Sequence, residues 1–396
     1  MKGVVGVVGQ GYVGLPLALE ISKCGYRVLG IDTNENLVKS LNLGSSKIED
    51  VSDIEISREL RANRYSATSD FTKLSDCTIK IVCVPTPLFN NKPDLSYLIQ
   101  AVTKVGTYLN EGDLVIIEST IEPETTRKML IPILVKESNL NSDEFYTAFS
   151  PERIDPINSK WGIKNTPKLV AGFNNSSRAK AVEFYSQFVA PIVECSSLEV
   201  AETAKLLENS FRLINISFIN EISMFCHKVG IEVNEVINAA ATKPYGFMPF
   251  YPSLGVGGHC IPVDPLYLAN KASALGATSR FIGLADEINQ EMPGYFVGRA
   301  EEKLGELKDK NILIVGVSYK PNIADTRETP ATSLISGFIR KGAHVEWHDD
   351  LVKEWNGKKS VPLSDNYDLA VIVTPHDYLD LTKLKNIPVL NTREST

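Results

Sequence analysis

Near its start the chain reads Val4-Val5-Gly6-Val7-Val8-Gly9-Gln10-Gly11-Tyr12-Val13-Gly14-Leu15-Pro16. An apolar run of strand length leads into the pattern Gly9-x-Gly11-x-x-Gly14, and residues 15–21 continue with a helical pattern. Glycines at these positions let backbone N–H groups approach a pyrophosphate at a helix amino end, where the helix dipole favours an anion. The stretch therefore predicts the strand, turn and helix of a dinucleotide-binding unit.

A second apolar strand, residues 27–31, ends at Asp32. A carboxylate at this spacing is typical of one that hydrogen-bonds the adenosine ribose of a dinucleotide. Its negative charge would also repel a 2′-phosphate. We therefore expect the cofactor to be NAD and not NADP.

Composition excludes several classes of function. The chain has 396 residues, enough for two or three domains, and its net charge of −7 without a basic run argues against a nucleic-acid partner. No apolar stretch reaches membrane-spanning length, and the first residues enter a strand directly, so we expect neither a membrane protein nor a signal peptide.

The six cysteines, at positions 24, 77, 83, 195, 226 and 260, are widely scattered and show no paired metal-ligand spacing. Such usage fits a reducing cytoplasm better than a disulfide framework. We therefore expect a cytoplasmic protein without a metal site.

Strand-like runs alternate with helical patterns along the first half, which is typical of a doubly wound parallel sheet. The runs lie at residues 4–9, 27–32, 79–84, 114–118, 146–150 and 169–172. Two turns, Val84-Pro85-Thr86-Pro87 and Glu118-Ser119-Thr120, follow strands where ligands of such sheets bind. Taken alone, either turn is equally compatible with ordinary loop chemistry.

A long helix is predicted next, because apolar residues recur in alternating steps of four and three. They occupy positions 200, 204, 207, 211, 214, 218, 222, 225 and 229. A capping box from Ser196 to Glu199 and a stop at Gly230 bound a helix of roughly 50 Å. This length exceeds one small core and indicates a subunit interface.

On a neighbouring face of this helix, Lys205, Asn209 and Arg212 follow the same spacing. A solvated surface is the plainer interpretation of that face when it is considered alone.

The last part begins near residue 305 and looks like a second α/β domain. Strand-like runs at 311–317, 343–348 and 369–374 and a helical stretch at 331–340 support this. Its first turn, Gly316-Val317-Ser318-Tyr319-Lys320, lacks the glycine fingerprint, so we expect a different nucleotide or none. Lys320 and Arg327 could contact phosphates, or could equally be solvated charges.

One further stretch carries chemistry: Gly257-Gly258-His259-Cys260-Ile261-Pro262-Val263-Asp264-Pro265. A cysteine thiolate is a strong covalent nucleophile once its surroundings activate it. For a lone cysteine, however, a glycine and proline turn around a buried thiol is the plainer interpretation.

Together these residues closely resemble the UDP-glucose/GDP-mannose dehydrogenase family. The matching motifs lie in order at 9–16, 84–87, 118–126, 150–153, 201–212, 257–265 and 319–327. The resemblance implies two doubly wound Rossmann-like domains of α/β class joined by a long central helix. It implies an NAD-binding domain (1–195), a central helical dimerisation and catalytic region (196–304) and a UDP-sugar-binding domain (305–396).

The family oxidises a sugar C6 alcohol to a carboxylate with two NAD molecules in succession. By resemblance, Cys260 captures the intermediate aldehyde and becomes a thioester that water hydrolyses. Lys205 and Asn209 match the positions that stabilise the C6 oxyanion, and Glu152 matches the general base. Thr120 and Asp264 match residues that hold water and the reacting groups.

The resemblance also assigns binding residues. Those for NAD are Gly9, Gly11, Tyr12, Val13, Gly14, Asp32, Pro85, Thr86, Ser119, Thr120 and Arg327. Those for the UDP-sugar are Glu152, Arg153, Lys205, Asn209, Tyr251, Gly257, Tyr319, Lys320 and Arg393. A homodimer through the central helix is implied, and no metal.

His259 before the cysteine and the segment 242–247 resemble the branch of the family that acts on UDP-N-acetylhexosamines, namely UDP-N-acetylglucosamine or UDP-N-acetylgalactosamine, for polysaccharide synthesis. UDP-N-acetylmannosamine dehydrogenases share the Gly-Gly-His-Cys pattern and remain an alternative, as does UDP-glucose. The chain departs from the family at Asn391, where members usually carry Asp.

The same residues bear on two other classes of function. A two-electron NAD dehydrogenase would need no nucleophilic cysteine, and the loop around Cys260 speaks against it. A non-catalytic NAD-binding protein predicts the loss of Cys260, Lys205 or Glu152, and all three are present.

Overall fold

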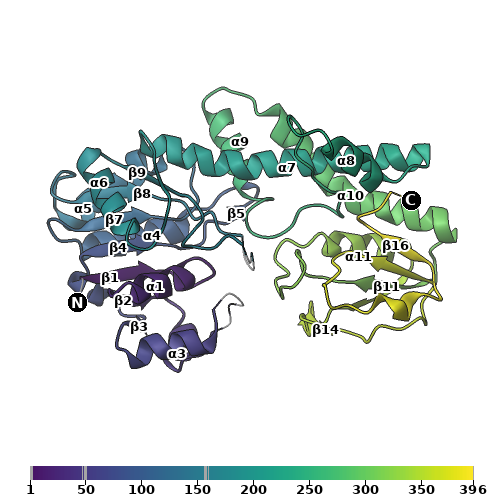
Figure 1. Cartoon of the computed structure of the whole chain (residues 1–396), viewed down its shortest axis with the longest axis horizontal. Coiled ribbons are helices and arrows are strands. Elements are labelled where there is room, and N and C mark those ends of the chain that lie inside the picture. Colours follow the sequence, from purple (N-terminus) through teal and green to yellow (C-terminus); the bar gives the residue numbers. More distant parts are fainter. Residues whose placement is uncertain (1–2, 47, 49–50, 156–157, 159, 396) are drawn as a thin grey trace. The chain divides into compact units, whose positions relative to one another are not determined.

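The computed structural model describes residues 3–46, 48, 51–155, 158 and 160–395. These fall into two units, Met1–Leu207 and Glu208–Thr396, the first built around a mostly parallel β-sheet and the second around a parallel one (Figure 1). The α/β class and the two Rossmann-type sheets are confirmed. The predicted domain boundaries at residues 195 and 304 remain a prediction.

The sheet of the first unit has the strand order β10-β9-β8-β7-β4-β1-β2-β3. All neighbours in it are parallel except β8 and β9, which are antiparallel. Its strands are β1 (Val4–Val8), β2 (Arg27–Ile31), β3 (Tyr65–Thr68), β4 (Ile79–Val82), β7 (Leu114–Ile117), β8 (Tyr146–Phe149), β9 (Lys168–Gly172) and β10 (Ile192–Glu194). A small hairpin pairs β5 (Leu88–Phe89) with β6 (Lys92–Pro93).

Both faces of this sheet are covered, so successive strand residues enter alternate cores. Ile116 packs in one core and Ile117 in the other, and both are fully buried. This explains why the central strands β1 and β7 carry no polar side chains. The surrounding helices are α1 (Gly14–Lys23), α2 (Glu35–Asn42), α3 (Asp53–Arg61), η1 (Phe71–Asp76), α4 (Ser96–Thr107), η2 (Thr126–Leu130), α5 (Ile131–Ser138) and α6 (Asn175–Tyr185).

The strand order reverses between β1 and β4, because the chain leaves β1 toward β2 and later returns to the other side. Loops at the carboxyl ends of these two strands therefore diverge and leave room for a ligand. Residues 9–13 and 83–87 form those two loops.

Helix α7 (Leu198–Val229) is the long central helix, with 32 residues. Its amino-terminal cap is Ser197, whose Oγ accepts the Val200 N–H at 3.3 Å. The predicted capping box from Ser196 is therefore wrong, since Glu199 pairs instead with Arg127 at 2.6 Å. The predicted stop is confirmed: Gly230 has φ +78° and bonds back to the carbonyl of Cys226.

The apolar stripe predicted on α7 is largely solvent-exposed. Leu207, Phe218 and Phe225 are 60%, 53% and 61% exposed. By contrast, Lys205 and Asn209 are buried, so the solvated-surface interpretation is wrong for both, although Arg212 is exposed. The buried side of α7 thus includes the polar side chains of Lys205 and Asn209, whereas Phe218 and Phe225 are exposed.

The second unit holds a parallel four-stranded sheet of order β12-β11-β15-β16. Helices α10 and α11 cover one face, while η3 and loop residues cover the other. The strands are β11 (Asn311–Val315), β12 (His344–His348), β15 (Leu369–Ile372) and β16 (Val389–Asn391), with a hairpin of β13 (Glu354–Trp355) and β14 (Lys358–Lys359). The helices are α8 (Val233–Ala241), α9 (Asp264–Ala274), α10 (Arg280–Leu304), α11 (Ala331–Arg340) and η3 (Leu381–Leu384).

Among the helices that the structure describes, none combines the length and apolarity needed to cross a membrane.

Candidate active site

The three glycines of the first turn have distinct physical roles. Gly9 has φ +92°, which a turn this tight requires, and a Cβ on Gly14 would lie 1.9 Å from the Gly9 carbonyl oxygen. At Gly11, a Cβ would meet no described atom within 4 Å. The turn therefore needs Gly9 and Gly14 for its own packing, and Gly11 leaves an open face where a pyrophosphate can approach.

Asp32 stands at the end of β2, directly beside this turn. Its Oδ2 accepts the Gln10 N–H at 2.8 Å, and its Oδ1 accepts the Asn34 N–H at 2.9 Å. The side chain is only half-buried. Each carboxylate oxygen has two lone pairs, so acceptor capacity remains for ribose hydroxyls.

The two turns predicted after β4 and β7 lie against each other. Ser119 Oγ donates to the Val84 carbonyl at 2.8 Å, and both Ser119 and Thr86 are buried. Pro85 and Thr120 are the neighbours of these residues along the chain. The structure thus joins residues 84–87 and 118–120 at one edge of the first sheet.

Glu152 lies in the turn after β8 and interacts electrostatically with Lys205 of α7. Burial raises the pKa of the Glu152 carboxyl above its ordinary value, and the Lys205 ammonium opposes that rise. The Ile154 N–H also donates to the Glu152 carboxylate. The geometry gives a carboxyl group that holds its proton to higher pH than a solvated glutamate.

Sequence reasoning missed a buried ion pair beneath this turn. Lys168 Nζ lies 2.8 Å from Glu118 Oε2 and 3.4 Å from the Pro151 carbonyl oxygen. The Tyr185 hydroxyl donates to the other oxygen of Glu118. The pair fixes the end of β7 to the start of the Glu152 turn. No local pattern could reveal it, because its members are far apart in sequence.

In the second unit, Cys260 precedes α9 and is exposed. Its carbonyl accepts the Asp264 N–H at 2.8 Å, which places the start of α9 beside the cysteine. The Asp264 carboxylate accepts a bond from Asn209 Nδ2 at 2.6 Å, and both side chains are buried. The buried-thiol interpretation of Cys260 is wrong, and the structure brings Asn209, Asp264 and the cysteine loop together.

The glycines before Cys260 are required by the loop that packs on them. A Cβ on Gly258 would lie 2.7 Å from the Tyr319 ring, and one on Gly257 would lie 2.8 Å from Tyr319 Cβ. The Gly258 N–H donates to the Arg327 carbonyl at 3.0 Å. Residues 319–328 therefore lie against the cysteine loop. Burial, and then the Arg327 cation, lower the pKa of His259, which favours its neutral form.

The remaining predicted residues are held in various ways. Arg327 Nε lies 2.9 and 3.0 Å from the two carboxylate oxygens of Asp325, and the Lys320 carbonyl accepts the Ser318 hydroxyl at 3.1 Å.

The Arg393 carbonyl accepts a bond from Asn234 at 2.9 Å, and burial lowers the pKa of the Arg393 side chain. Four others vary in exposure: Tyr12 and Tyr251 are exposed, and Val13 and Arg153 are half-buried.

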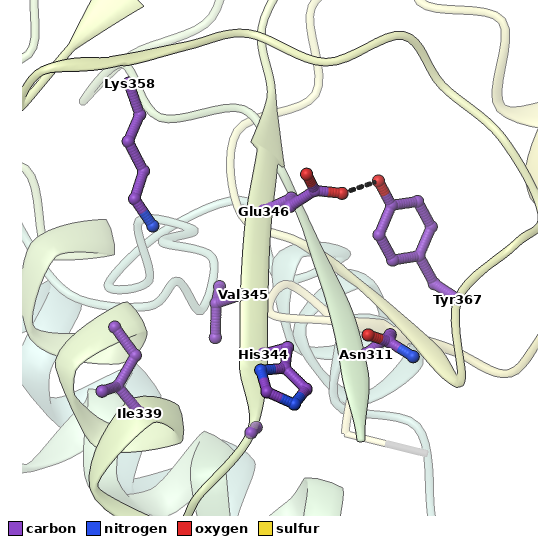
Figure 2. Close-up of a pocket in the computed structure, with 8 residues that line it drawn as sticks. Asn311, Ile339, His344, Val345, Glu346, Lys358 and Tyr367 are labelled. Atoms are coloured by element: carbon purple, nitrogen blue, oxygen red, sulfur yellow. Dashed lines mark hydrogen bonds between the residues drawn. The ribbon is translucent and has the colours of Figure 1, made fainter. Parts of the chain in front are cut away.

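A pocket in the second unit lies away from these residues. Figure 2 shows it at the amino ends of β11 and β12, beside Asn311 and His344, where Tyr367 donates to Glu346 at 2.6 Å. The ligand edge of a parallel sheet is the opposite, carboxyl edge. None of the predicted site residues lines this pocket, so we assign it no part in the reaction.

The glycine turn and the acid after β2 are typical of a dinucleotide-dependent oxidoreductase, and the thiol of Cys260 is exposed. Three family models agree with that class. Residues 3–189 match the NAD binding domain of the UDP-glucose/GDP-mannose dehydrogenase family, residues 199–291 its central domain and residues 313–394 its UDP binding domain. The chain belongs to this family and is an NAD-dependent nucleotide-sugar dehydrogenase.

Individual relatives are similar over nearly the whole chain. A UDP-N-acetyl-D-glucosamine 6-dehydrogenase of Salmonella typhi is 34% identical, with coverage of 94% of this chain and 89% of the relative. A UDP-N-acetyl-D-mannosamine dehydrogenase of Methanococcus maripaludis is 32% identical, with coverage of 96% and 88%. The solved UDP-D-ManNAc dehydrogenase of Pyrococcus horikoshii superposes with a TM-score of 0.91 at 30% identity, covering 99% and 96%.

Proposed function

We propose that the protein oxidises the C6 hydroxyl of a UDP-N-acetylhexosamine, UDP-N-acetylglucosamine or UDP-N-acetylgalactosamine, to the uronic acid through a thioester on Cys260. The observation that carries this proposal is the exposed thiol at the start of α9, beside the buried pair of Asn209 and Asp264. NAD, when bound, accepts one hydride in each of the two oxidations.

Cys260 divides the reaction into two manageable stages. Its Sγ bonds to the C6 aldehyde carbon left by the first oxidation while the thiol proton passes to the former carbonyl oxygen, giving a thiohemiacetal that keeps the oxidised carbon bound to the protein. The second oxidation turns this adduct into a thioester. Water then adds to the thioester carbon and the C–S bond breaks, which releases the carboxylate and restores the thiol.

Glu152 is the proposed acceptor of the proton from that water. A general base works best when its pKa is close to the working pH, and burial moves the Glu152 carboxyl in that direction. We assign Lys205 and Asn209, four residues apart on α7, to the C6 oxyanion. Asn209 uses one Nδ2 hydrogen on Asp264, which leaves its second for this role.

The open turn at Gly11 supports the proposed placement of the NAD pyrophosphate. The proposed NAD contacts are Gly9, Gly11, Tyr12, Val13, Gly14, Asp32, Pro85, Thr86, Ser119, Thr120 and Arg327. The proposed UDP-sugar contacts are Glu152, Arg153, Lys205, Asn209, Tyr251, Gly257, Tyr319, Lys320 and Arg393. The proposal for the second set draws on the matched UDP binding domain and on the packing of Tyr319 over the cysteine loop.

The acetamido group is the finer part of the proposal. Relatives named for UDP-N-acetylglucosamine and for UDP-N-acetylmannosamine are both similar to this chain, and His259 precedes the nucleophile here. A site shaped for the acetamido amide would bind UDP-glucose poorly, because its polar groups would stay unpaired. UDP-N-acetylmannosamine, whose acetamido group points to the other face of the ring, is the second candidate substrate.

A homodimer through α7 is the proposed assembly. The exposed stripe of Leu207, Phe211, Phe218 and Phe225 runs along one side of this helix, and such contiguous apolar surface is typical of an interface. We propose the cytoplasm as its location, where the six thiols would stay reduced, and polysaccharide synthesis as its pathway.

A competition assay tests the proposed function. UDP-glucose, UDP-N-acetylglucosamine, UDP-N-acetylgalactosamine and UDP-N-acetylmannosamine are supplied together with NAD, and NADH and acid products are counted. We expect two NADH per sugar and a preference for a gluco- or galacto-configured acetamido sugar. A preference for UDP-glucose would refute the acetamido assignment, and a preference for UDP-N-acetylmannosamine would refute only the configuration.

A further inference from the structure

A buried histidine stands at the carboxyl edge of the second sheet, outside the residues assigned so far. His376 follows β15 by four positions, and its side chain is buried with that of Asp349, the residue after β12. His376 Nε2 lies 3.1 Å from Asp349 Oδ1. On its other side, the Asn322 N–H donates to His376 Nδ1 at 2.9 Å.

These two contacts fix the protonation of the ring. A backbone N–H can only donate, so Nδ1 must carry a lone pair and no proton. Nε2 therefore carries the hydrogen and donates it to the Asp349 carboxylate. His376 thus links a carboxylate at one strand end to the backbone of the loop after β11.

The loop position that His376 holds is a strained one. Asn322 has φ +66°, a left-handed conformation that non-glycine residues rarely adopt. Its side chain and Asp377 bond reciprocally: Asn322 Nδ2 donates to Asp377 Oδ2 at 2.8 Å, and the Asp377 N–H donates back at 3.1 Å. Residues 376 and 377 together thus hold Asn322 in this conformation.

The same short loop packs against the two glycines that precede Cys260. Tyr319, three residues before Asn322, packs its ring on Gly258, and the Arg327 carbonyl accepts the Gly258 N–H. Inside the loop, the Tyr319 N–H bonds to the Asp325 carbonyl at 3.0 Å. Holding Asn322 in place therefore also holds Tyr319, Lys320 and Arg327 relative to the cysteine loop.

We infer that His376 is a positioning residue that fixes the loop of residues 319–328 for binding of the uridine diphosphate part of the substrate. The inference deepens the proposed function and rests on its use of Tyr319 and Lys320 as substrate contacts. The loop is set before the ligand arrives, so ordering it costs no binding free energy at that moment.

Two substitutions at position 376 each keep one of the two hydrogen bonds of the imidazole ring and remove the other. In His376→Gln the side-chain amide nitrogen can replace Nε2 as donor to Asp349, but the acceptor for Asn322 is lost. In His376→Asn the side-chain oxygen can replace Nδ1 as acceptor, but the donor to Asp349 is lost. Asp349 keeps backbone N–H donors from Val317, Ser318, Leu351 and Val352, so this second variant should still fold.

Calorimetric titration of the full chain with UDP, without turnover, gives the first measurement. We expect His376→Gln to weaken UDP binding about tenfold, because a buried N–H is left unpaired and the loop is released. Its KM for the UDP-sugar should rise by a similar factor, with a smaller change in kcat. His376→Asn should bind UDP like the wild type, although it melts at a lower temperature.

Hydrogen exchange provides a second measurement. If His376 had only a general structural role, the two variants would change amide exchange to the same extent. The amides of Gly258 and of residues 319–328 should exchange faster in the Gln variant and not in the Asn variant. Equal UDP affinity in the wild type and His376→Gln, or an equal loss in both variants, would overturn the inference.

If the Gln variant does not fold, Asn322→Gly tests the loop from the other side. Glycine accepts the left-handed conformation but cannot bond to Asp377, so UDP binding should weaken there too; unchanged affinity in this folded variant would also overturn the inference. A wild-type protein that binds UDP but oxidises no UDP-N-acetylhexosamine would break the proposed function alone, and the binding comparison would still decide the role of His376.

Discussion

The two Rossmann-type sheets of this chain share a hydrogen-bonded glycine turn after their first strand, but the carboxylate beside that turn has different surroundings in each. In each, a glycine with positive φ follows the first strand: Gly9 at +92° after β1 and Gly316 at +83° after β11. Each glycine N–H bonds to the end of the second strand at 2.8 Å, on Ile31 in one unit and His348 in the other. The carboxylate that follows then accepts N–H bonds from the turn, Asp32 from Gln10 and Asp349 from Val317.

The difference lies in what else each carboxylate does. Asp32 is half-buried and keeps acceptor capacity, whereas Asp349 is fully buried and satisfied by four backbone N–H groups and His376. The first carboxylate is available to a ribose and the second is not. One fold therefore yields a dinucleotide site in one unit and a loop support in the other.

The largest expected effect concerns the residue that neither sheet supplies. Cys260→Ala should abolish formation of the uronic acid, because no thioester can form, while NAD binding in the first unit stays unchanged. Product analysis by mass spectrometry and NAD titration check both parts. Cys24→Ser, a change of a half-buried thiol in the first unit, is the matched control and should remain active. Normal turnover in Cys260→Ala would refute the thioester mechanism.

Substituting each of the two carboxylates in turn tests the comparison directly. Asp32→Ala should weaken NAD binding by roughly 10- to 100-fold, since charged hydrogen bonds contribute about 1.5–3 kcal/mol each. Asp349→Asn should leave NAD binding unchanged and lower the melting temperature instead. Fluorescence titration with NAD and thermal unfolding measure the two effects. Equal loss of NAD affinity in both variants would show that the carboxylates are not functionally distinct.

Lowering the pH should remove the contribution of the Asp349 carboxylate to the free energy of unfolding. Hydrogen bonds from His376 and from the backbone lower the pKa of Asp349 from 3.8 to about 2, although burial alone would raise it. A lowered pKa in the folded state adds stability that is present above pH 3.8 and is lost as pH falls toward 2. A shift of this size corresponds to about 2 kcal/mol.

Denaturant unfolding at a series of pH values measures that contribution. The wild type should lose about that amount of its free energy of unfolding between pH 4 and 2 relative to Asp349→Asn. The same pH slope in both proteins would contradict the assigned bonds.

Much of this architecture could be predicted from local patterns. The glycine turn, Asp32 after the second strand and the helix at residues 331–340 were expected where the structure has them, because each depends on neighbours in sequence. Strand β3 was not expected: Tyr65-Ser66-Ala67-Thr68 is short and mixed in polarity, and only its pairing with β2 makes it a strand.

The predicted site shows where local patterns stop being informative. The spacing on α7 identified two faces but could not tell which one points inward, so the burial of Lys205 and Asn209 had to come from the structure. The side-chain partners of Asp264, Glu118 and Asp349 are Asn209, Lys168 and His376, and each lies more than 20 residues away in the sequence. Such bonds follow from how loops and strand ends meet, which no window of sequence contains.

The smallest expected effect extends the comparison to a third carboxyl group. Asp349 is buried with many hydrogen-bond donors, and its pKa falls. Glu152 is half-buried with fewer donors, and desolvation raises its pKa above 4.5. If Glu152 must be ionised to accept a proton from water, turnover should decline as pH falls through that raised value. The acidic limb of the kcat profile should therefore lie above pH 4.5.

Substitutions in the buried ion pair of Glu118 and Lys168 should shift the acidic limb of the kcat profile. The Glu118 carboxylate raises the pKa of Glu152 and the Lys168 ammonium lowers it. Glu118→Gln, which keeps the shape and leaves Lys168 charged, should shift the limb to lower pH by less than about one unit. The double variant Glu118→Gln with Lys168→Met removes both charges, so its limb should return toward that of the wild type. A limb that ignores both changes would mean that Glu152 does not control the acidic side of the profile, and another group would have to be the base.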